Sequence, residues 1–148
     1  MANFIGALLA SLAIVVVALW RGSLSRSGGA AALVVGTLIM WLGGWAWGLV
    51  LGIFFVSSSA LSHFKETEKR AAAEKFEKGH RRDVGQVLAN GGLGTLLAIG
   101  SALFPSPAWF FLYIGVMATV TADTWATEIG TLSKSPPRLI TTGARVDV

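Results

Sequence analysis

Residues 28–62 read GGAAALVVGTLIMWLGGWAWGLVLGIFFVSSSALS and contain no charged side chain. A transmembrane helix needs about 20 mainly apolar residues, so this stretch is too long for a single crossing. Gly43 and Gly44 stand near its middle and favour a turn there. The stretch therefore predicts two membrane-spanning helices, over about 27–42 and 44–62.

Three further apolar segments lie on either side of this pair, at 2–20, 84–104 and 108–132. Pro105 and Pro107 close the second of them, and Pro136 and Pro137 close the third, because proline ends a helix. The expected fold class is all-α: a polytopic transmembrane bundle of about five helices. Residues 1–148 are expected to form a single integral membrane domain.

The charged residues are few and unevenly placed. Only 14% of the chain is charged, against roughly 25% in an average soluble domain. The basic residues lie in the segments 21–27 and 63–83 and in the tail from Lys134. If the helices alternate, these segments share one side, and the positive-inside rule puts them in the cytoplasm and the amino terminus outside. Because the basic residues lie between apolar segments, the net charge of +4 favours anionic lipid headgroups or phosphorylated ligands as partners over nucleic acid.

The chain has no cysteine, which excludes disulfides, thiolate metal sites and cysteine nucleophiles. Its most informative polar residues lie in segment 108–132. At 100° per residue, five of them fall within one arc of about 140°: Asp123, Thr124, Thr127, Glu128 and Thr131. An acid at the centre of a membrane helix costs about 2.5–3.5 kcal/mol, so the two acids need compensation. A buried salt bridge to Arg82, Lys65 or Lys134 would supply it, and so would a metal ion.

Two other helices carry polar stripes that also run toward the cytoplasmic surface. One stripe consists of Asp83, Gln86, Asn90 and Gly94, and the other of Ser58, Ser62, Lys65 and Lys69. Hydroxyls and amides in membrane helices often hydrogen-bond only to a neighbouring helix. The same groups are also suited to a phosphate site.

Carboxylates are ligands that Mg²⁺ accepts, together with phosphate oxygens and water. Asp123 and Glu128 are therefore the predicted magnesium ligands, and Asn90 is predicted to orient a reacting oxygen beside them. The predicted substrate-binding residues are Lys65, Arg82, Asp83, Gln86, Ser58, Thr124, Thr127 and Lys134. Such a site would act by positioning and charge neutralisation.

Three motifs carry a family resemblance: FFVSSS over residues 54–59, GQVLANGG over 85–92 and ADTWATEIG over 122–130. They resemble the membrane family that contains phytyl-phosphate kinase of plants and transmembrane protein 19, known as domain of unknown function family 92. The resemblance implies a polytopic helical membrane protein. For the kinase branch it implies transfer of phosphate from a nucleoside triphosphate, thought to be CTP, to an isoprenyl monophosphate. The family pattern continues into further helices, so this chain is expected to be an amino-terminal portion of a longer family domain.

The leading hypothesis is thus a magnesium-dependent lipid-phosphate kinase whose partners are the bilayer, a prenyl phosphate and a nucleoside triphosphate. A transporter or ion pathway that uses Asp123 and Glu128 is the first alternative. A non-catalytic membrane scaffold is the second, and association into a homo-oligomer is compatible with all three.

Overall fold

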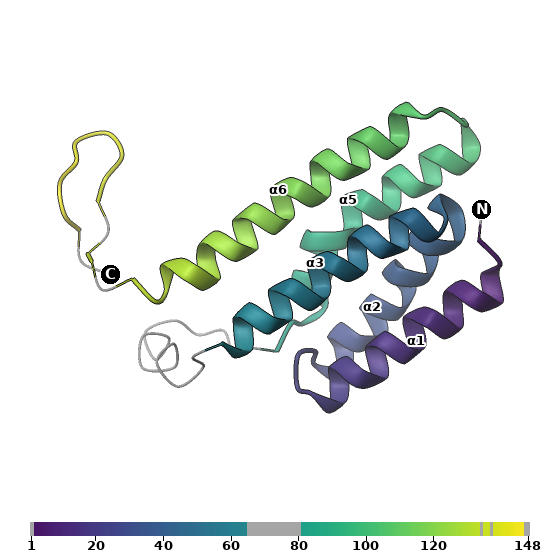
Figure 1. Ribbon diagram of the computed structural model, residues 1–148, viewed down its shortest axis with the longest axis horizontal. Coiled ribbons are helices and arrows are strands. Elements are labelled where there is room, and N and C mark those ends of the chain that lie inside the picture. Colours follow the sequence, from purple (N-terminus) through teal and green to yellow (C-terminus); the bar gives the residue numbers. More distant parts are fainter. Residues whose placement is uncertain (1, 65–80, 134, 137, 147–148) are drawn as a thin grey trace.

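The computed structural model describes residues 2–64, 81–133, 135–136 and 138–146. The segment 65–80 of the expected basic loop therefore lies outside the described residues. Where the chain is described it is helical and forms no strand, which confirms the expected all-α class (Figure 1). The elements are α1 (Phe4–Trp20), α2 (Arg26–Leu38), the π-helix η1 (Ile39–Gly43), α3 (Trp45–His63), α5 (Val84–Leu103) and α6 (Ala108–Gly130).

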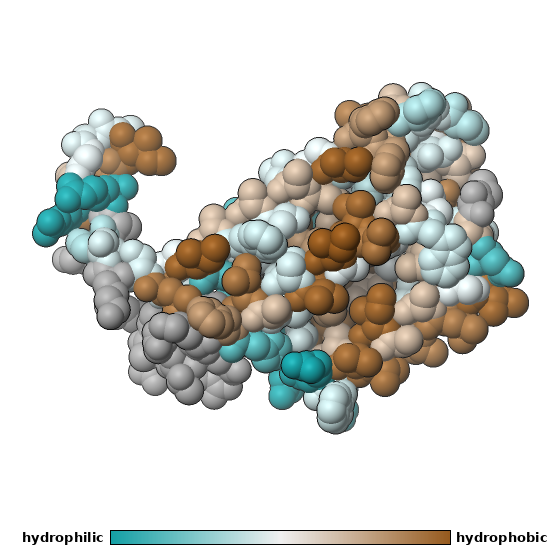
Figure 2. Space-filling view, in the orientation of Figure 1, coloured by the Kyte–Doolittle hydropathy of each residue, from teal (hydrophilic) through white to brown (hydrophobic). Residues whose placement is uncertain are grey.

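Within the described residues, three helical stretches are long and apolar enough to cross a membrane: Arg26–Gly43, Trp45–His63 and Val84–Leu103. Helix α1 is apolar but shorter, with 17 residues. Helix α6 has 23 residues but carries both acids, and it is not among the three. Large apolar side chains cover much of the outer surface, as Figure 2 shows for one face. Such a surface suits lipid and not water, so the chain is a helical membrane bundle.

The long apolar stretch reverses direction at η1. Gly44 ends the turn with φ of 96°, a backbone conformation that favours glycine. A side chain at Gly43 would collide with the ring of Trp47, so the turn also needs a glycine there. The backbone N–H of Ala2 donates to the carbonyl of Trp41 at 3.1 Å, which fixes the amino terminus against this turn.

The helices form an incomplete ring. Helix α1 packs on α2, α2 on α5, α5 on α6 and α6 on α3, while η1 contacts α1, α2, α3 and α5 at one end. Direct packing between α1 and α3 is sparse in comparison, so the ring is open between these two helices. The loop after α1 and the chain entering α5 lie at the opposite end of the bundle from the amino terminus (Figure 1).

Aromatic side chains join α6 to α3. The rings of Trp47 and Tyr113 stack with centroids 4.3 Å apart, and the Tyr113 hydroxyl donates to the Trp47 carbonyl at 2.9 Å. Tyr113 and Met117 are the buried residues of α6. Trp109, Phe110 and Val120 pack partly buried against the same core, so α6 attaches to α3 and α5 along one face of the helix.

Candidate functional site

The backbone of Arg82 pairs with the loop that joins α1 to α2. The Arg82 N–H donates to the Ser23 carbonyl at 3.1 Å, and the Ser25 N–H donates to the Arg82 carbonyl at 3.0 Å. A side chain at Gly28, in the first turn of α2, would collide with the Arg82 carbonyl. Residue 82 is thus locked between two elements. We call this end of the bundle, formed by residues 21–25 and 81–83, the Arg82 end.

The side chain of Arg82 turns inward and is only 7% exposed. Its Nη1 donates to Ser59 Oγ at 2.9 Å, and its Nη2 lies 3.5 Å from Ser62 Oγ. The guanidinium also lies over the Phe55 ring, 5.6 Å from the centroid, which is cation–π geometry. Residues 55, 59 and 62 are four and three apart, so they share one face of α3. That face holds the arginine.

Glu128 on α6 joins the same network through Ser62. The Ser62 hydroxyl donates to Glu128 Oε1 at 2.5 Å and also lies 3.0 Å from the Ser58 carbonyl. A hydroxyl has one proton, so Ser62 donates to one of these acceptors at a time. The carboxylate, as the charged acceptor, forms the stronger bond. Arg82, Ser62 and Glu128 therefore connect the start of α5, α3 and α6.

Burial lowers the pKa of the Arg82 guanidinium from its ordinary value, and the negative charge of Glu128 raises it again. Arginine ordinarily titrates above pH 12, so Arg82 stays charged at neutral pH. A cation held away from water attracts anions more strongly than an exposed one. The Arg82 end is therefore suited to an anionic ligand.

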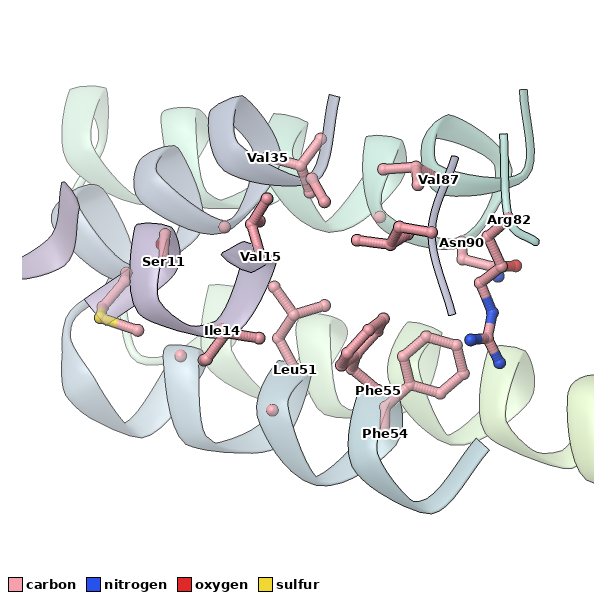
Figure 3. Close-up of a pocket in the computed structure, with 17 residues that line it drawn as sticks. Ser11, Ile14, Val15, Val35, Leu51, Phe54, Phe55, Arg82, Val87 and Asn90 are labelled. Carbon is pink, nitrogen blue, oxygen red and sulfur yellow. The ribbon is translucent and has the colours of Figure 1, made fainter. Parts of the chain in front are cut away.

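An apolar cavity of about 80 Å³ lies between α1, α2, α3 and α5. Arg82 and Asn90 line one end of it, and Ser11 lines it toward the other end, with apolar side chains between them (Figure 3). Ser11 is 4% exposed, and its hydroxyl has no hydrogen-bond partner in the part of the chain that the structure describes. The cavity thus combines a charged end with an apolar body.

The other predicted residues of α5 lie close to this end. Asp83 caps the helix, because its Oδ1 accepts from the Gln86 backbone N–H at 2.8 Å. Gln86 and Asn90 are half-buried one turn apart, and Asn90 reaches the cavity. Ser58 on α3 is fully buried, and its hydroxyl has no partner among the described residues.

The predicted site residues of α6 lie on two different sides of the helix. Glu128 and Thr124 are half-buried, whereas Asp123 and Thr127 are exposed. The Thr127 hydroxyl donates to the Asp123 carbonyl of its own helix at 3.0 Å. Five residues place Asp123 and Glu128 about 140° apart around the axis, so only Glu128 faces Ser62 and Arg82. No group of three histidines or acids that could hold a metal occurs in the described ranges.

The structure therefore brings Arg82, Asn90, Ser58 and Glu128 to one end of the bundle, with Asp83 and Gln86 beside them. Two other predicted residues, Lys65 and Lys134, lie outside the described residues. The arrangement includes three residues that the sequence did not assign to the site, Ser11, Phe55 and Ser59, and also Ser62, which the sequence placed in a polar stripe but not among the substrate-binding residues. Ser59 and Ser62 belong to a serine-rich helix end, which was a usable signal, and Ser11 is a polar residue inside an apolar segment.

Comparison with known proteins identifies a family and relatives that match most of the chain. A family model described as "Integral membrane protein DUF92" matches residues 9–148. "Protein PGR" of Arabidopsis thaliana is 35% identical over 136 residues, which cover 82% of this chain and 47% of that protein. "Uncharacterized membrane protein MJ0933" of Methanocaldococcus jannaschii is 32% identical over 119 residues, covering 80% of this chain and 48% of that protein. The chain thus spans about half the length of these relatives. No solved structure matches it.

Proposed function

This chain belongs to the DUF92 family of integral membrane proteins, and from that premise we propose that it is a lipid-phosphate kinase. Its reaction would transfer a phosphoryl group from a nucleoside triphosphate, CTP in our proposal, to an isoprenyl monophosphate such as phytyl monophosphate. One observation carries the proposal: the apolar cavity ends at a buried, charged arginine. A ligand that fits both parts has an apolar tail and an anionic head.

We propose that Arg82 binds the phosphate groups, because one guanidinium can donate two parallel N–H bonds to two oxygens of a phosphate. It has five N–H donors, and the bonds to Ser59 and Ser62 use only part of that capacity. Asn90, which lines the cavity beside Arg82, is assigned to orient the attacking oxygen. The remaining proposed substrate-binding residues are Lys65, Asp83, Gln86, Ser58, Thr124, Thr127 and Lys134.

Magnesium is the proposed cofactor. Mg²⁺ usually takes one or two protein carboxylates and completes its shell with phosphate oxygens and water. Glu128 fits this requirement as a half-buried carboxylate next to Arg82. Asp123 faces outward on the same helix, so both acids would serve one ion only if a phosphate or water molecules bridge them. When bound, the ion would neutralise charge on the triphosphate.

The proposed reaction needs no covalent step on the protein. An oxygen of the isoprenyl monophosphate attacks the γ-phosphorus of CTP and forms a new P–O bond. The bond between the γ-phosphorus and the bridging oxygen breaks, and CDP leaves with that oxygen and its electron pair. Any proton on the attacking phosphate passes to water. Arg82 and Asn90 hold the reacting groups, which is the main contribution of a protein to this reaction.

We also assign a side of the membrane to the site. The Arg82 end contains Arg21, Arg81 and Arg82, and in the sequence the basic residues of segment 65–80 come between α3 and this end. Basic residues gather on the cytoplasmic side, where nucleoside triphosphates are available. The amino terminus would then lie outside.

The test is a transfer reaction with the 148-residue chain in lipid nanodiscs. The chain is supplied with CTP, Mg²⁺ and phytyl monophosphate, and the products are separated for phytyl diphosphate and CDP. Formation of both in equal amounts is the expected result, with no product when Mg²⁺ is removed. Absence of the diphosphate with CTP and with the other nucleoside triphosphates would refute the kinase proposal. Acid-dependent ion flux across sealed liposomes that contain the chain would instead favour the ion pathway.

A further inference from the structure

Two apolar grooves continue the cavity on the outside of the bundle, where the ring is open between α1 and α3. The larger groove has a volume of about 770 Å³ and begins near Trp45. The second has a volume of about 550 Å³ and ends at Arg21, Ser23 and His63, which lie at the Arg82 end. Ile14 and Val56 line both, so the two grooves adjoin. Together they follow the length of α3.

The cavity and the larger groove adjoin each other and share a wall of four residues. Ile14, Met40, Gly48 and Gly52 line both spaces. Two of these four are glycines of α3, which contribute no side chain to the wall. Nothing lies within 4 Å of the position where a Cβ of Gly52 would stand. The wall at this residue is therefore open to an apolar group.

The size of the cavity limits what it can enclose. A cavity of about 150 Å³ accommodates one benzene molecule, whereas this one has about 80 Å³. An isoprenyl chain of several five-carbon units is much larger than benzene. Only the part of the tail next to the phosphate could occupy the cavity, so the rest must leave it, and the wall at Gly52 opens into the groove.

We propose that the α1–α3 gap is a lateral access route that the tail of an isoprenyl monophosphate occupies. The anionic head lies at Arg82, the first part of the tail crosses the cavity wall at Gly52, and the remainder lies in the groove against the bilayer. This proposal rests on the kinase proposal for the class of lipid. Two observations support the occupant: Arg82 is a buried cation at the end of the route, and the groove walls are almost entirely apolar.

The test uses an isoprenyl monophosphate that carries a diazirine near the far end of its tail. The probe is added to the chain in nanodiscs, light is applied, and the labelled peptides are mapped. We expect labels on the groove residues, among them Leu49, Ile53 and Val56. Labelling of exposed Phe111 and Leu112 on α6 at the same yield would overturn the proposal, because it would mean that the tail has no preferred route.

A matched pair of variants shows whether the route passes Gly52. Gly52→Phe fills the opening, and Gly115→Phe makes the same change on an exposed part of α6 where a Cβ also meets nothing within 4 Å. We expect Gly52→Phe to reduce labelling of the groove about 10-fold, equivalent to about 1.4 kcal/mol, and Gly115→Phe to leave it unchanged. Equal labelling in the two variants would exclude passage at Gly52.

The labelling result does not depend on turnover, so the two proposals can fail separately. If the wild-type chain labels the groove but makes no diphosphate, the access route stands and the kinase reaction is refuted. If it makes the diphosphate but labels other surfaces, the reaction stands and the route is refuted. A probe with a neutral alcohol in place of the phosphate should label the groove less, because Arg82 then has no anion to bind.

Discussion

The backbone and the side chain of Arg82 contact different parts of the molecule. The backbone pairs with Ser23 and Ser25, while the guanidinium reaches Ser59 and Ser62 on α3. A buried cation is costly unless it is paired and hydrogen-bonded, and Glu128 supplies the opposite charge nearby. Removal of the whole side chain would therefore disturb both folding and binding. A conservative change separates the two effects.

We predict that Arg82→Lys weakens binding of isoprenyl monophosphate by about 10-fold while the chain still folds. Lysine keeps the charge but cannot bond two serines and a phosphate with a planar fork. Binding is measured by titrating the lipid into nanodiscs that contain the chain. Arg26→Lys, at an exposed residue outside the cavity, is the matched control and should bind normally. Equal binding in the two variants would remove Arg82 from the phosphate site.

Arg82 could be identified from the sequence as a candidate site residue, but the residues that it contacts could not. A basic residue next to an apolar segment indicates a membrane edge, and the serine run 57–59 indicates a polar helix end. Which hydroxyls meet the guanidinium depends on how α3 packs beside the chain that enters α5, and a single sequence does not specify that packing. The same limit applies to the acids of α6. Their arc was correct as helical geometry, yet only packing decides that Glu128 faces inward and Asp123 outward.

At the scale of the elements, the first turn of α2 lies directly against the Arg82 carbonyl. Gly28 is buried at this contact, and the position requires glycine because any side chain would collide with that carbonyl. Asp83 then begins α5 with a side-chain cap. The α1–α2 loop, α2 and α5 are therefore positioned by one close backbone contact.

Gly28→Ala should destabilise the bundle by about 1–3 kcal/mol, because the added methyl group forces the two backbones apart. Gly92→Ala is the matched control: it lies within α5, and a Cβ there meets nothing within 4 Å. Replacing glycine by alanine in a helix should stabilise it by about 0.5–1 kcal/mol. Thermal unfolding in detergent, followed by circular dichroism, measures both. Changes of the same sign would contradict the assigned contact.

The helix ends could be anticipated because they depend on local chemistry. Gly44 has a positive φ and stands between η1 and α3, and Asp83 caps α5. The π-helical turn before Gly44 had no sequence signal.

At the scale of the whole molecule, α6 is attached to α3 and α5 along one face. Tyr113 and Met117 are buried, and Glu128 meets Ser62 near the other end of the helix. The Tyr113 hydroxyl, which donates to the Trp47 carbonyl, is buried in this contact. The orientation of Glu128 toward Arg82 therefore depends on how firmly α6 is attached to α3.

Tyr113→Phe should cost about 0.5–1.5 kcal/mol of stability, because the contact between α6 and α3 loses one buried hydrogen bond while the Trp47 carbonyl keeps its bond within α3. Thr119→Val is the comparison, since its exposed hydroxyl bonds to the Gly115 carbonyl of its own helix and does not join α6 to another described helix. That variant should change stability by less than about 0.5 kcal/mol. Chemical unfolding in mixed micelles provides the measurement. A neutral Tyr113→Phe would show that this hydroxyl does not attach α6.

The opening between α1 and α3 bears on whether the protein would respond to the concentration of a lipid in the bilayer or to its concentration in the whole sample. A ligand that arrives through this opening comes from the plane of the membrane and not from water. Occupancy would then follow the mole fraction of the lipid within the bilayer. Adding inert phospholipid at constant total substrate would lower the rate by surface dilution, whereas adding buffer would leave it unchanged.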